Sequence, residues 1–140
     1  MSLQDKMTLY KLKKKYENFP GIRSFRIVLS EELTENEVNE IVTIRKLDSS
    51  CNERISIGTD RCQLIDWTIE KILPYLDNES EIIIGGEGGI AVYFENIEMF
   101  LDHYFKINKS LDIIILNRNL KKCIAVFEEE YFLEFFIRNI

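Results

Sequence analysis

The fold of this chain is decided by residues 111–127, which read LDIIILNRNLKKCIAVF. The runs 111–116 and 123–127 are apolar and rich in the β-branched residues that favour strands. The segment between them, 117–122, is mostly polar and has the composition of a turn. We therefore predict an antiparallel hairpin formed by these two runs.

A second hairpin is predicted just upstream, where 82–84 and 90–94 have the same strand-like composition. The glycine-rich segment 85–89 separates them and suits a turn that needs positive φ angles. An alternative reading is a glycine-lined anion site. A phosphate loop, however, leads into a helix N-terminus, whereas this segment leads into another apolar strand.

Helix signals dominate the first half of the chain. Ser2-x-x-Asp5 and Thr34-x-x-Glu37 are capping boxes, and apolar residues follow each of them at spacings of three and four. Further helices are expected after Asp60 and after Asn96. The predicted helices therefore run from residue 2 to about 18, over 35–46, from about 60 to the proline at 74, and from 96 to about 108–110.

Two further strands and a closing helix complete the prediction. The strands are expected at 22–29 and 54–58, where β-type residues alternate imperfectly with polar ones. Residues 128–138 begin with three glutamates and contain four aromatic rings, which favours a short packed helix. Some of these rings are expected in the core, and one or two on a contact surface.

Helical patterns predominate in the first half of the chain and hairpins in the second half. This segregation predicts an α+β fold. Its sheet should be mostly antiparallel, with about five to six strands and three to five helices. A length of 140 residues suits one domain, so we expect residues 1–140 to form a single unit.

Composition indicates a folded, cytoplasmic protein. Hydrophobic residues make up 46% of the chain and charged residues 30%, a balance typical of globular domains. The longest aliphatic runs are far too short to span a bilayer, and the first residues do not resemble a secretory signal. The expected compartment is therefore the cytoplasm, with no contact to membranes.

Charge is unevenly distributed along the chain. Residues 1–30 hold seven basic and two acidic side chains, and residues 31–140 hold 11 basic and 22 acidic ones. An acidic body disfavours nucleic-acid binding and favours a basic protein partner. The lysines at 11, 13, 14 and 15 are interpreted as a solvated face or an intramolecular contact, with nucleic acid or membrane contact as the alternative.

The sequence offers little material for catalysis or metal binding. His103 is the only histidine, and its helical position is typical of a surface residue. Cys51, Cys62 and Cys123 match neither a disulfide framework nor a zinc knuckle, so we expect reduced thiols and no structural zinc. No cofactor is predicted. The paired acids of the chain are interpreted as solvated or helix-capping groups rather than as acid–base catalysts.

The second half of the chain resembles the closing region of small bacterial immunity proteins, which neutralise polymorphic or contact-dependent inhibition toxins. The resemblance rests on the apolar helix from Trp67, on 112–117, and on the strand and acidic segment 123–130. It carries no invariant motif. It implies a protein that acts by binding in the cytosol and covers the active site or the docking surface of one cognate toxin, commonly a nuclease with a basic groove.

We accordingly predict a partner-binding surface without catalytic residues. The acids expected to form it are Glu79, Glu81, Glu87, Glu128, Glu129 and Glu130. The expected oligomeric state is a monomer or a weak dimer.

Two other classes of function remain open at this stage. A small enzyme would need a polar constellation, for which Asp60, Arg61, Asp66 and Glu87 are the candidates. A regulatory domain would instead bind a small ligand in a pocket beneath the glycine hairpin.

Overall fold

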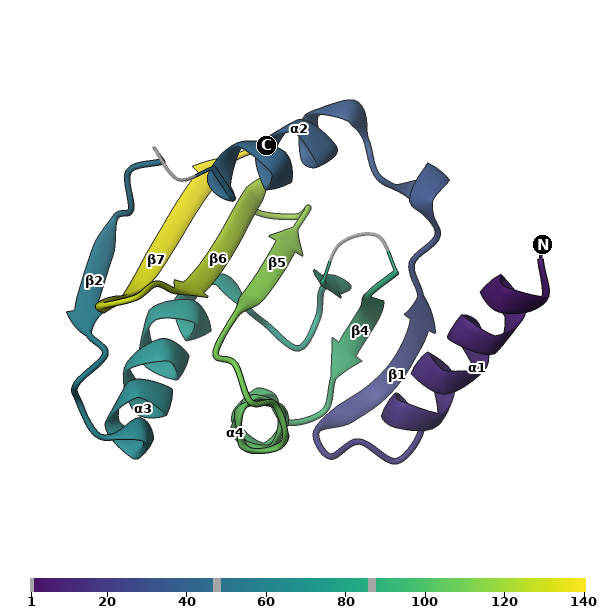
Figure 1. Ribbon diagram of the computed structural model, residues 1–140. Coiled ribbons are helices and arrows are strands. Elements are labelled where there is room, and N and C mark those ends of the chain that lie inside the picture. The colour runs from purple at the N-terminus through teal and green to yellow at the C-terminus, as the bar shows by residue number, and fades with distance from the viewer. Residues whose placement is uncertain (1, 47–48, 86–87) are drawn as a thin grey trace.

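The computed structural model describes residues 2–46, 49–85 and 88–140. Within this part of the chain, four α-helices pack on an antiparallel sheet of seven strands (Figure 1). The predicted α+β class is thereby confirmed, as is the expected range of helices. The sheet has one strand more than the five or six predicted.

The elements follow one another in a simple order. Their bounds are α1 (Leu3–Tyr16), β1 (Ile22–Ile27), α2 (Glu35–Ile44), β2 (Glu53–Ser56), α3 (Arg61–Ile72), β3 (Ile82–Ile84), β4 (Ile90–Phe94), α4 (Ile97–Ile107), β5 (Ile113–Asn117), β6 (Lys122–Glu128) and β7 (Phe132–Asn139). Two 3-10 turns, η1 (Ser30–Glu32) and η2 (Leu73–Tyr75), lie before α2 and after α3. Pro74 lies in η2, where the α3 helix ends as predicted.

The sheet order is β1-β4-β3-β5-β6-β7-β2. Both predicted hairpins form: Ile84 pairs with Ile90 in β3 and β4, and Ile113 pairs with Val126 in β5 and β6. The two strands predicted from weaker signals, β1 and β2, become the edges of the sheet. Segments far apart in the sequence therefore meet at both edges, where β1 pairs with β4 and β2 with β7, and at the centre, where β3 pairs with β5.

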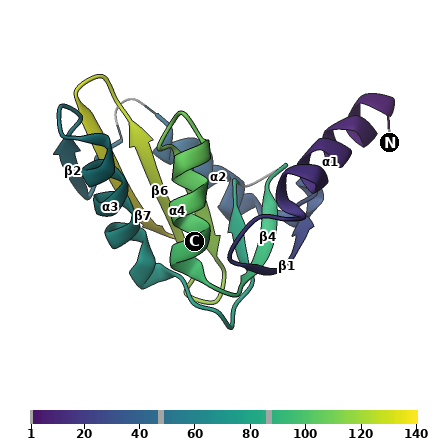
Figure 2. The same ribbon diagram turned by 90° about the horizontal axis from the view of Figure 1, so that it is seen from below.

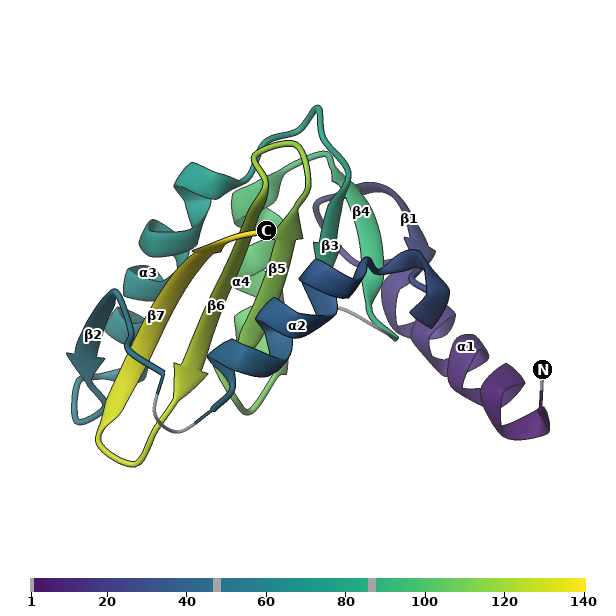
Figure 3. The ribbon, with the colours of Figure 1, turned by 90° about the horizontal axis from the view of Figure 1, so that it is seen from above.

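Helices cover the two faces of the sheet unequally. Helices α1, α3 and α4 lie on one face (Figure 2), where they enclose the larger apolar cluster. Only α2, among the described helices, lies on the other (Figure 3), which we call the α2 face. Side chains alternate between the faces, so that Ile82 and Ile84 enter the large cluster and Ile83 the small one.

Local capping interactions explain where the first two helices begin. The side chains of Ser2 and Thr34 accept hydrogen bonds from the backbone N–H groups of Asp5 and Glu37, and both capping boxes are complete. Helix α1 ends at Tyr16 and α2 at Ile44, each two residues before the predicted end.

The closing segment corrects the sequence-based prediction. Residues 128–138 do not form a helix: Glu128 ends β6, a turn follows, and β7 runs from Phe132 to Asn139. Strand β7 lies between β6 and β2 and pairs with both. Because apolar residues of β7 are buried on both faces, its sequence lacks the alternation that identifies a half-buried strand.

Candidate binding surface

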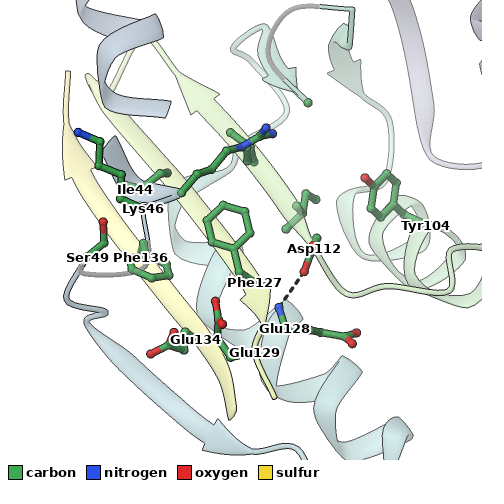
Figure 4. Close-up of a pocket in the computed structure, with 14 residues that line it drawn as sticks. Ile44, Lys46, Ser49, Tyr104, Asp112, Phe127, Glu128, Glu129, Glu134 and Phe136 are labelled. Carbon is green, nitrogen blue, oxygen red and sulfur yellow. Dashed lines mark hydrogen bonds between the residues drawn. The ribbon is translucent and has the colours of Figure 1, made fainter. Parts of the chain in front are cut away.

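The α2 face is only partly covered. Helix α2 packs mainly on β6, where Ile44 contacts a cluster that contains Cys123, Ala125 and Phe136. Beyond the C-terminal end of α2, the face carries a pocket of about 450 Å³ (Figure 4). The pocket is thus formed where the single covering helix stops.

The floor of this pocket is apolar and aromatic. Ile114 from β5, Phe127 from β6 and Phe136 from β7 line it, together with Ile44 from α2. The rings of Phe127 and Phe136 lie 5.6 Å apart between centroids. Phe136 is buried, whereas Phe127 is half-buried and lines the pocket (Figure 4). A partly accessible aromatic ring in a pocket, such as Phe127, is typical of surfaces that bind other molecules.

The walls of the pocket carry opposite charges. Asp112, Glu128, Glu129 and Glu134 come from the β5–β6–β7 side, and Arg45 and Lys46 from the end of α2. The acids gather here because β5 begins, β6 ends and β7 begins at the same end of the sheet. We call Asp112, Glu128, Glu129 and Glu134 the acidic rim.

Two members of the acidic rim also hold the strands together. The Glu128 N–H donates to Oδ1 of Asp112 at 2.7 Å, and the Leu111 N–H donates to Oε1 of Glu128 at 2.6 Å. Nη1 of Arg61 lies 3.9 Å from the same Glu128 oxygen. These two carboxylates therefore anchor the start of β5 to the end of β6, and their role is at least partly structural.

The other two acids are less engaged. The Glu129 N–H donates to the carbonyl of Phe132 across the β6–β7 turn, and its side chain lines the pocket. Glu134 faces Arg54 on the neighbouring strand β2. Burial and the nearby Glu134 together raise the pKa of the Cys51 thiol. Glu129 and Glu134 thus leave negative charge available at the pocket.

Tyr104 closes the far side of the pocket from α4. Burial raises the pKa of its hydroxyl, and the negative charge of Asp112 raises it further. The ring also packs against Phe100 and Phe105. Tyr104 is therefore a neutral wall residue whose position is fixed by the core.

The structure separates the six acids predicted to bind a partner. Glu79 and Glu81 precede β3, at the end of the sheet where β5 ends and β6 begins, whereas Glu128–Glu130 lie at the opposite end. A strand of five residues such as β5 spans roughly 17 Å. Glu81 is also engaged by Arg26, whose Nη2 donates to it at 2.9 Å. Glu87 lies outside the described residues.

Three of the candidate enzyme residues, Asp60, Arg61 and Asp66, lie at the start of α3 or on it, and Glu87 lies outside the described residues. Asp60 caps α3 by accepting the Cys62 N–H at 3.1 Å. Arg61 donates to the carbonyls of Asn108 and Lys109, and Asp66 is exposed on α3. The first two residues thus have structural hydrogen bonds.

The histidine and the three cysteines lie at different depths of the fold. His103 is half-buried and packs edge-on against Phe19, with ring centroids 4.7 Å apart. Cys51 is half-buried, Cys62 exposed and Cys123 buried, and all three are free thiols. In the described ranges, the His, Cys, Asp and Glu side chains form no group of three that could hold a metal ion.

Sequence reasoning missed much of the pocket. Asp112, Glu134, Arg45 and Lys46 were not predicted as site residues, and Phe127 was assigned only to a strand. A signal did exist for Glu134, because a strand at 132–139 would place it on the same face as Phe136. The assignment of this segment to a helix concealed this placement of Glu134.

Comparison of the chain with protein-family models, characterised proteins and solved structures found no significant match. No helix in the described part of the chain has the length and apolar character needed to cross a membrane.

Proposed function

We propose that this protein is a cytosolic binding protein that neutralises a cognate bacterial toxin, and that its acidic rim and aromatic floor contact the partner. The observation that carries the proposal is the pocket on the α2 face, in which the half-buried ring of Phe127 is bordered by carboxylates. Aromatic rings in a pocket supply binding energy, and surrounding charges select the partner and raise the association rate.

The charge of the chain supports a basic partner. Its formal net charge is −6, and residues 31–140 carry 11 more acidic than basic side chains. A toxin that cleaves nucleic acid needs a basic groove, so an acidic inhibitor would be steered toward it. Arg45 and Lys46 on the opposite wall would pair with acids at the border of such a groove.

Co-expression with the product of the neighbouring gene tests this proposal. The diagnostic variant is Glu129→Lys with Glu130→Lys, at the acidic rim and the adjacent turn. Both residues are exposed, so the free energy of unfolding should change by less than about 0.5 kcal/mol. Association should slow by about tenfold or more at low salt, and the difference should shrink as salt is added.

A matched control separates a local surface from overall charge. Glu79→Lys with Glu95→Lys makes the same change in net charge at the opposite end of the sheet, again on exposed side chains. This control should bind almost as fast as the wild type. Equal slowing by both pairs of reversals, or failure of the neighbouring product to bind at all, would reject the acidic-rim mechanism.

A second candidate function is the binding of a small ligand. The pocket volume of about 450 Å³ falls within the range of small-molecule sites, and its apolar floor and polar walls suit one. A metabolite that raises the melting temperature of the wild type, but not of Phe127→Ala, would favour this alternative. Turnover of a small molecule by the isolated chain would replace both proposals with an enzyme.

A further inference from the structure

Helix α1 makes few contacts with the rest of the chain. Leu9, Leu12 and Tyr16 face the body of the protein, next to β1. Residues 3–8 are all exposed, and the N-terminal half of the helix projects beyond the sheet (Figure 2). A helix of 14 residues is only marginally stable in water without packing. The exposed half of α1 would therefore gain from a second contact.

The outward side of α1 carries an apolar stripe. Leu3, Met7 and Tyr10 follow at spacings of four and three and so share one face, and their side chains are 75%, 52% and 63% exposed. Lys6 and Lys11 flank this stripe on its two sides. The segment 3–16 contains five lysines and one aspartate, a net charge of +4. We call this surface the α1 stripe.

A surface of opposite charge lies on η1 and α2. Leu29, Val38 and Val42 are exposed there, and the two valines share one face of α2 at a spacing of four. The segment 30–44 contains five glutamates and no basic residue. Among these acids, Glu32 forms an ion pair with Arg26 and Glu37 forms one with Arg118. Glu35 is exposed close to Val38 and Val42 on the same helix. We call the surface formed by Leu29, Val38 and Val42 the α2 stripe.

We propose that two copies of this chain form a two-fold symmetric dimer in which the α1 stripe of each copy packs against the α2 stripe of the other. Pairing α1 with α1 would bring lysines together, and pairing α2 with α2 would bring glutamates together. The α1–α2 pairing instead joins opposite charges around two apolar stripes, as in helix pairs whose partner is chosen by flanking charges. Two-fold symmetry uses both stripes of both copies.

The dimer should be weak, because two helix pairs form a small interface. We expect a dissociation constant on the order of tens of micromolar at low salt, with weaker association as salt is added. Sedimentation of the chain of residues 1–140 between about 1 µM and about 1 mM would cover this range. Met7→Glu places a charge in the α1 stripe without harming helix propensity, and it should shift the dissociation constant upward by at least tenfold.

A charge exchange between copies tests the pairing itself. One variant carries Lys6→Glu and Lys11→Glu beside the α1 stripe, and the other carries Glu35→Lys and Asn39→Lys beside the α2 stripe. Each variant alone would oppose like charges and should be monomeric. Mixed together, the two variants restore opposite charges at both helix pairs, so they should form a heterodimer. All four positions are exposed, and circular dichroism should confirm that both variants remain folded.

The outcomes are distinct. Recovery of a dimer only in the mixture supports the proposal. A wild type that remains monomeric to about 1 mM overturns it, and so does a dimer that is indifferent to Met7→Glu or to the charge exchange. Monomeric chain that floats with phosphatidylserine vesicles would assign α1 to an anionic membrane and would equally overturn the dimer. None of these results depends on the toxin partner.

Discussion

Gly21 shows how a single residue fixes the path of the chain. It joins α1 to β1 with φ +82°, and its carbonyl accepts the N–H groups of Glu95 and Asn96 at 2.7 and 3.1 Å. A Cβ added at this position would lie 2.3 Å from the carbonyl oxygen of Asn96 and 2.7 Å from the backbone nitrogen of Phe100. Glycine is thus required both for its backbone angle and for the close approach of α4.

Gly21→Ala should therefore lower the free energy of unfolding by about 2 kcal/mol or more in urea titrations. Two other glycines separate the causes. Gly88 has φ +75° but open space around it, so Gly88→Ala should cost about 1 kcal/mol. Gly58 has neither constraint, and Gly58→Ala should stay within about 0.5 kcal/mol of the wild type. Equal effects at positions 21 and 58 would contradict the steric explanation.

At the scale of elements, one ion pair connects α2 to the sheet. Arg118, just after β5, donates from Nε to Oε2 of Glu37 at 2.7 Å and from Nη2 to Oε1 at 2.9 Å. Oε1 also accepts the Thr34 N–H at 2.8 Å, which completes the cap of α2. Glu37 is buried, and the hydrogen bonds from Arg118 are the largest cause that lowers its pKa. The pair therefore holds the covering helix of the α2 face in position.

This lowered pKa predicts a pH-dependent contribution to stability. Because the unfolded state binds the proton more tightly, the contribution of Glu37 is complete above its ordinary pKa of 4.5 and is lost as the pH falls through the lower folded value. Glu37→Gln should cost about 2 kcal/mol at pH 7, measured by urea unfolding. The difference from the wild type should shrink toward about pH 3.

Glu35→Gln provides the control for this ion pair, because Glu35 lies two residues earlier on the same helix and is exposed. Its effect should be within about 0.5 kcal/mol at either pH. A cost for Glu37→Gln that is unchanged between neutral and acidic pH would mean that the carboxylate charge contributes nothing and that only packing is lost.

At the scale of the whole molecule, the three thiols lie at different depths in the fold, so their reactivity measures how well each region is protected from solvent. Cys62 is exposed at the start of α3, whereas Cys123 is buried between the sheet and α2. Burial raises the pKa of Cys123 to about 12, so its reactive thiolate is scarce in the folded state. Access to this sulfur requires that α2 separates from β6 or that the domain unfolds.

Thiol labelling at neutral pH should therefore show one fast cysteine, Cys62, and one slow cysteine, Cys123. Native-state labelling of Cys123 should accelerate with urea in proportion to unfolding, and in Glu37→Gln because α2 is held less firmly. Mass spectrometry of the labelled peptides identifies each site. Labelling of Cys123 as fast as that of Cys62 would show that α2 does not protect the α2 face.

Local chemistry determined much of this fold from the sequence. The two capping boxes, the two hairpins and the approximate positions of α3 and α4 follow from interactions within a few residues of one another. The same holds for the α+β class, since it depends on the order of these elements. The candidate surface was only partly predictable: Glu128 and Glu129 were predicted to bind the partner, although at the start of a closing helix, and the aromatic floor beneath them was not predicted.

The tertiary structure alone decided the remainder, because it depends on contacts between distant segments. Residues 128–138 form the end of β6 and the strand β7 rather than a helix because β6 and β2 supply hydrogen bonds on both sides. Glu79 and Glu81 are separated from Glu128–Glu130 because the antiparallel pairing of β3, β5 and β6 places them at opposite ends of the sheet. The pocket exists because α2 ends before it covers Phe127. Sequence patterns indicate which secondary structure each segment prefers. Which strands become neighbours, and which part of the sheet a helix covers, are set by the packing of the whole chain.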